Sequence, residues 1–105
     1  MDVSELKKIS DRSYNIAVAK QNALEKAKSD MLVPYEGHLL NADPDTINLI
    51  SNLSEDKNEF VILDVNENPL LVKDSTALLS LLKAKNQEVL NRYHQTYQQF
   101  TKKKI

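Results

Sequence analysis

The spacing of apolar residues changes twice along this chain, and that change restricts its fold more than any other feature. Before about residue 28 and again after residue 75, apolar residues recur at three- and four-residue steps, as in helices with one apolar face. Between residues 31 and 73 they come in short runs, separated by proline, aspartate, asparagine or the single glycine, which is typical of strands and turns. The sequence therefore predicts one α+β domain, residues 1–105.

The first segment, residues 1–30, is predicted to be a long helix. Its apolar stripe consists of Val3, Leu6, Ile9, Ile16, Ala19, Ala23, Leu24 and Ala27. Much of the stripe is alanine, so the helix buries little apolar surface and would be marginal alone. We expect it to pack on a partner helix, either in the same copy of the chain or in another.

The middle segment, residues 31–73, is predicted to form a hairpin, a short helix and a second hairpin. Glu36-Gly37 suits the first turn, because glycine supplies the positive φ that a tight hairpin turn requires. Asp43-Pro44 is typical of a helix start, with aspartate as the N-cap and proline in the first turn. The strands of the second hairpin are expected within residues 59–65 and 70–72. We expect the two hairpins to form one small antiparallel sheet.

The third segment, residues 74–105, is predicted to be one long helix. Its inward positions fit a seven-residue frame, with Leu79, Leu82, Asn86, Val89, Tyr93, Thr96 and Phe100 forming a seam. A polar asparagine in such a seam fixes register and oligomeric state in coiled coils. Two interpretations stay open: the helix packs on its own sheet and first helix, or the seam binds a protein partner or a second copy. The seam is the candidate protein-interaction face.

Composition excludes several kinds of chemistry. The chain has no cysteine, and one glycine is too few for a glycine-rich phosphate loop. His38 and His94 stand in unrelated contexts, with no carboxylate three or four residues away to orient either ring. We therefore expect no enzyme, no catalytic residues and no cofactor. His38 is expected at the surface.

Two stretches imitate calcium loops. Residues 41–45 and 64–68 place oxygen-bearing side chains at alternate positions. Both lack the glycine at the sixth position and the glutamate at the twelfth that such loops need. We interpret them as a helix N-cap and a hairpin turn, and we expect no metal.

Charge is unevenly distributed along the chain. Residues 36–74 carry two basic and nine acidic side chains, a net of −7, whereas residues 75–105 carry six basic and one acidic, a net of +5. A basic helix can indicate nucleic-acid binding. The overall net charge of −1 and the acidic middle segment oppose that interpretation, so no nucleic acid is expected. No apolar run approaches the ~20 residues of a membrane span, and no signal peptide is evident, so no membrane is expected either.

Three groups of residues together resemble a known family. They are the run from Val33 to His38, the run from Asn41 to Asp45, and the pair Ile50 and Leu53. In this order they are similar to a domain of unknown function carried by bacteriophages and prophages, common in tail-fibre assembly proteins and related small tail proteins. The chain departs from that pattern in having no tryptophan before the second turn.

The resemblance implies a non-enzymatic, chaperone-like interaction protein that binds a phage tail or tail-fibre protein. It would act in the cytoplasm of an infected or lysogenic bacterium, or be part of the virion. Two alternatives remain: a small DNA-associated phage regulator that uses the basic third segment, and an antagonist of a host protein.

Overall fold

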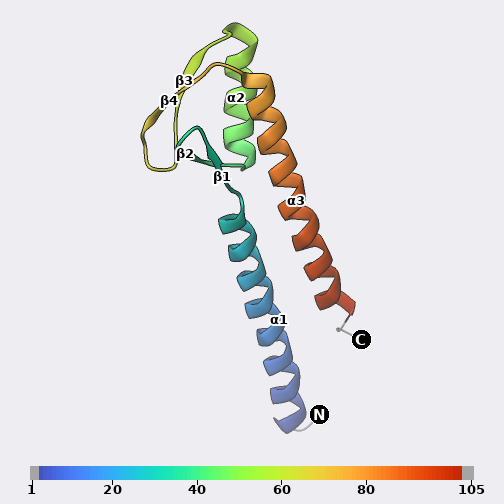
Figure 1. Cartoon of the computed structure of the whole chain (residues 1–105). Helices are drawn as coiled ribbons and strands as arrows, with labels where there is room; N and C mark the ends of the chain where they lie inside the picture. Colours follow the sequence, from blue (N-terminus) through green and yellow to red (C-terminus); the bar gives the residue numbers. More distant parts are fainter. Residues whose placement is uncertain (1–2, 103–105) are drawn as a thin grey trace.

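The computed structural model describes the backbone of residues 3–102 and the side chains of residues 15–100 (Figure 1). The elements are α1 (Val3–Asp30), β1 (Leu32–Tyr35), β2 (His38–Asn41), α2 (Pro44–Asp56), β3 (Phe60–Leu63), β4 (Pro69–Val72) and α3 (Ser75–Lys102). The predicted α+β class, with long first and last helices around two hairpins, is confirmed. The molecule is elongated, 66 × 23 × 21 Å.

Local sequence signals set most of these boundaries. The Asp43 carboxylate accepts the Thr46 backbone N–H at 2.9 Å and so begins α2, with Pro44 in its first turn. Asp74 does the same for α3 by accepting the Ala77 N–H at 3.1 Å. The first hairpin turns at Glu36 and Gly37, whose φ angles are +49° and +80°. This pair of positive angles matches the twist of the flanking strands.

The two hairpins differ from the prediction in one respect. They form two separate two-stranded sheets rather than one sheet, with β1 paired to β2 and β3 paired to β4. The hairpins do meet at one end, where the Val65 N–H donates to the Leu39 carbonyl at 3.0 Å. The neighbouring Asp64 N–H is bound by the Asn68 carbonyl inside the second turn, so it does not extend a ladder toward β2.

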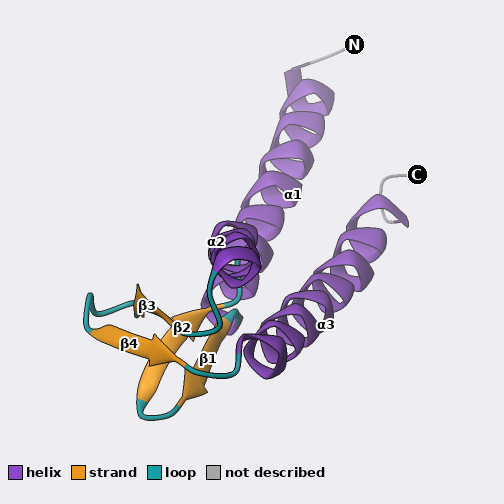
Figure 2. Ribbon diagram, turned by 90° about the horizontal axis from the view of Figure 1, so that it is seen from above, coloured by secondary structure: helices purple, strands orange, loops and turns teal. Residues whose placement is uncertain are grey.

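The core lies between α2, the inner faces of the hairpins and the first half of α3. Its largest fully buried side chains are Leu40, Ile50, Leu78, Leu82, Val72 and Val89. From this core α1 and α3 run side by side in opposite directions, and α1 extends beyond the end of α3 (Figures 1 and 2). Ala27 and Met31 connect α1 to the core.

Part of the predicted stripe on α1 cannot be compared, because Val3, Leu6 and Ile9 lie outside the described side chains. Within the described residues, no helix combines the length and apolar character needed to cross a bilayer.

Candidate protein-interaction site

The first half of the predicted seam on α3 is used inside the chain. Leu82 and Val89 are fully buried, and Leu79 packs against the same core. These side chains belong to the core of the chain and not to a free surface. That the seam binds another protein stays a prediction. It now concerns only the second half of the seam, because the first half is buried in the core.

Asn86, the polar residue of the seam, has a partner within the chain. Its Nδ2 donates to the Ala42 carbonyl at 2.9 Å and lies 3.7 Å from the Met31 sulfur. Its Oδ1 accepts a bond from the Gln87 side chain at 3.0 Å. Asn86 therefore fixes α3 against the end of the first hairpin, which gives it a register role inside one copy.

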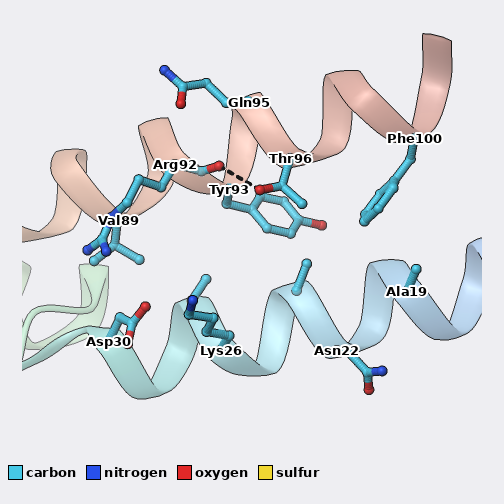
Figure 3. A pocket seen from close by; sticks show the side chains of 12 residues that line it. Ala19, Asn22, Lys26, Asp30, Val89, Arg92, Tyr93, Gln95, Thr96 and Phe100 are labelled. Atoms are coloured by element: carbon cyan, nitrogen blue, oxygen red, sulfur yellow. Dashed lines mark hydrogen bonds between the residues drawn. The ribbon is translucent and has the colours of Figure 1, made fainter. Parts of the chain in front are cut away.

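The second half of the seam faces α1. Figure 3 shows Val89, Tyr93 and Phe100 pointing from α3 toward α1, where alanines such as Ala19 face them. Side chains of both helices line an open groove of about 590 Å³. On this helix pair the Lys20 ammonium also lies 5.9 Å from the centre of the Tyr97 ring. In this structure α1 covers the aromatic side chains of α3 in the same chain. The apolar stripe of α1 allowed two arrangements, packing within one copy or between two copies, and this is the first of them.

A second apolar surface lies on the β3–β4 hairpin, and sequence analysis did not identify it. Strand alternation puts Phe60 and Ile62 in the core, while Val61 and Leu63 are 58% and 63% exposed. On β4 the alternation leaves Leu71 42% exposed. We call Val61, Leu63, Val65, Pro69 and Leu71 the outer hairpin face. In register, Val61 lies opposite Leu71 and Leu63 opposite Pro69, so both strands contribute to one face.

This outer hairpin face departs from the usual pattern of a hairpin at a protein surface. A two-stranded antiparallel sheet normally places polar side chains on its solvent side. Here the runs 60–63 and 69–72 are apolar at every position. Such continuous apolar runs are typical of strands covered on both faces, and this was the available sequence signal. Exposed apolar faces are typical of surfaces through which proteins interact.

One side-chain contact joins the two hairpins beside this face. The His38 ring donates its Nδ1–H to Asp64 Oδ2 at 2.7 Å, and the Asp64 side chain is only 2% exposed. The other carboxylate oxygen, Oδ1, accepts the backbone N–H groups of Asn66 and Asn68, both at 2.9 Å. His38 was expected at the surface, and its side chain is 24% exposed; its carboxylate partner is 26 residues away in sequence.

These hydrogen bonds determine the charge state of the carboxylate. The bond from His38 lowers the pKa of Asp64 below its ordinary value of 3.8, and the N–H groups of Asn68 and Asn66 act in the same direction. Burial acts in the opposite direction and is outweighed. Asp64 is therefore ionised at neutral pH and only accepts hydrogen bonds, which makes the His38 nitrogen the donor.

The residues that imitate calcium loops have structural partners. Asp43 caps α2, and Asp64 holds the second turn. His94 lies exposed on α3. Among the described residues, no group of three or more histidine, aspartate or glutamate side chains is placed to hold a metal ion.

The basic residues of α3 are partly neutralised by their own helix. Glu88 lies 3.5 Å from Arg92 and 3.9 Å from Lys85. Such exposed pairs contribute little to stability, about 0–1 kcal/mol, but they reduce the local positive charge. Whether the basic helix binds nucleic acid stays a prediction, and we still expect that it does not.

Comparison with known families identifies one match. The family model described as "Transcription factor TFIIH complex subunit Tfb5" matches residues 31–98, which is well over half of the 105 residues. The matched region begins directly after α1 and contains both hairpins, α2 and most of α3. Comparison with curated proteins and with solved structures finds no match.

This match shows that the resemblance to phage tail proteins was wrong. The expected tail partner, the chaperone role in tail assembly, and the location in a bacterial host or virion rested on that resemblance and are wrong with it. The residues that carried it, such as Gly37 and Asp43-Pro44, form a hairpin turn and a helix cap. Unrelated folds use the same residues for the same local purpose. The chain belongs to the Tfb5 family of TFIIH complex subunits.

Proposed function

We propose that this chain is a non-enzymatic subunit of a transcription-factor complex of the TFIIH type. In this proposal it binds another subunit of that complex through the outer hairpin face. The family description supports membership of such a complex. The observation that carries the binding site is the exposed apolar face formed by Val61, Leu63 and Leu71.

The chemistry of this face suits a protein partner. Burying one large apolar side chain contributes roughly 1.5–3 kcal/mol, so a few such residues at the centre of an interface can dominate its affinity. The face also lies on short strands with free edges, where a partner could add main-chain hydrogen bonds. A face of this composition has no role in the core of the chain, because the opposite face of each strand already fills it.

The test is co-purification with the other TFIIH subunits after co-expression. The double variant Val61→Lys with Leu71→Lys places two charges on the outer hairpin face. We expect it to reduce recovery of the complex more than about tenfold, which corresponds to about 1.4 kcal/mol, while circular dichroism shows a folded chain.

A matched control makes the same chemical change elsewhere. Leu49→Lys with Leu81→Lys also replaces two exposed apolar residues, 50% and 41% exposed, but these lie on α2 and α3. The control should be recovered like the wild type. Full recovery of the hairpin variant would contradict the proposal, as would a loss confined to the control.

A further inference from the structure

We propose that His38 is a positioning residue for the outer hairpin face: by holding the Asp64 carboxylate inward, it keeps Leu63 and Val65 pointing outward for the partner. This inference rests on the proposed function, because it assigns a role in partner binding to a residue that is not on the binding face.

The first step is the alternation of side chains at the end of β3. Successive residues of an extended chain point to opposite sides. Asp64 points inward, with its side chain 2% exposed, and its neighbours Leu63 and Val65 are 63% and 42% exposed. Alternation applies to Leu63, the last residue of β3, whereas Val65 lies in the turn that the Asp64 carboxylate holds through the Asn66 and Asn68 N–H groups. The positions of both apolar residues therefore depend on Asp64.

The second step is the cost of keeping that carboxylate inward. An ionised carboxylate that loses contact with water needs hydrogen bonds to both of its oxygens. Oδ1 accepts two hydrogen bonds from backbone N–H groups of the turn. The hydrogen bond to Oδ2 comes from His38, at 2.7 Å. Without His38, Oδ2 would be left unpaired inside the protein. Release of the carboxylate into water would then be favoured. The turn would lose the bonds from the Asn66 and Asn68 N–H groups, and with them the fixed positions of Leu63 and Val65.

The third step is how little else holds this end of the hairpin. β3 and β4 are four residues each, and a lone two-stranded sheet is marginally stable. Phe60 and Val72 contact the core at the far end of the ladder, and the buried pair Ile62 and Leu70 contacts it one position before the turn. Beside the turn, two hydrogen bonds join the hairpins within the described residues: the His38–Asp64 contact and the backbone bond from Val65 to Leu39. His38 thus holds the turn itself, which lies beyond the last core pair, Ile62 and Leu70.

The test compares two substitutions at His38. His38→Leu removes the donor, whereas His38→Asn keeps an N–H donor at nearly the position of Nδ1. In the co-purification described above, we expect His38→Leu to reduce recovery about three- to tenfold and His38→Asn to restore most of it. A purely volume-based role would instead favour leucine over asparagine.

A second measurement on the chain alone keeps the inference separate from the proposed function. Amide hydrogen exchange should become faster across residues 63–69 in His38→Leu, and remain at the wild-type rate in α3. If exchange changes in this way but Val61→Lys with Leu71→Lys still binds, the proposed function fails and the support by His38 stands. If His38→Leu matches the wild type in both exchange and recovery, while the hairpin variant loses binding, the positioning role is refuted.

Discussion

At the scale of single residues, the structure depends on a few aspartates that bind backbone N–H groups. Asp43 and Asp74 do so at helix starts, and Asp64 does so in the second turn. The first two act within three residues of their own position, and the Asp43 cap was predicted from the sequence alone. Asp64 also binds His38 across 26 residues, and nothing in the local sequence signals that contact.

The lowered pKa of Asp64 predicts a dependence of stability on pH. The unfolded chain binds a proton at Asp64 near pH 3.8, whereas the folded chain binds it only at lower pH. Ionised Asp64 therefore adds stability above about pH 4, and that contribution is lost as the pH falls through the folded-state pKa. We expect Asp64→Asn to lower the melting temperature at pH 7 and to reduce the difference in melting temperature between pH 7 and pH 3.

The control for this prediction is Glu59→Gln, which removes an exposed carboxylate near the same strand. Its difference in melting temperature between pH 7 and pH 3 should stay close to that of the wild type. An Asp64→Asn variant with an unchanged difference would show that the Asp64 carboxylate contributes nothing to acid sensitivity.

At the scale of elements, the sequence predicted where helices and turns begin better than it predicted which strands form a sheet. The turn at Gly37, the start of α2 at Pro44 and the uninterrupted length of α3 each have a local cause that the sequence displays. The separation of the hairpins into two sheets has no such cause, because it depends on how the second hairpin packs on the core. The outer hairpin face was not predicted for a different reason: its apolar runs predict strands, but only the packing of the hairpin decides which of their two apolar faces is buried.

The first turn offers a test of backbone conformation alone. Gly37 has a φ of +80°, and a Cβ added there would meet nothing within 4 Å. Gly37→Ala should therefore lower the free energy of unfolding by about 1–2 kcal/mol, through backbone strain and not through a clash. Urea denaturation measures this change.

The comparison variant is Gly37→Asn, because asparagine tolerates positive φ better than alanine. It should lose less stability than Gly37→Ala. Equal losses for both variants would mean that the space around the turn, and not its φ angle, limits the substitution.

At the scale of the whole molecule, the sequence predicted the order of its parts but not the family. The phage resemblance rested on caps and turns, whose physical causes are shared by many folds. The Tfb5 family model covers residues 31–98 as one region, and it leaves α1 outside the match. How α1 sits could not be predicted, because its alanine-rich stripe suits a partner helix in the same copy or in another.

The position of α1 leads to a prediction about oligomeric state. In the structure α1 covers Tyr93 and Phe100, the rings that a second copy would otherwise bury. We therefore expect light scattering to give a mass near 12.0 kDa even at high protein concentration. The double variant Tyr93→Lys with Phe100→Lys should keep that mass, while hydrogen exchange becomes faster in α1, because charged side chains weaken its packing on α3. A wild-type mass twice as large, falling to 12.0 kDa in the double variant, would instead show that the aromatic face of α3 pairs two copies.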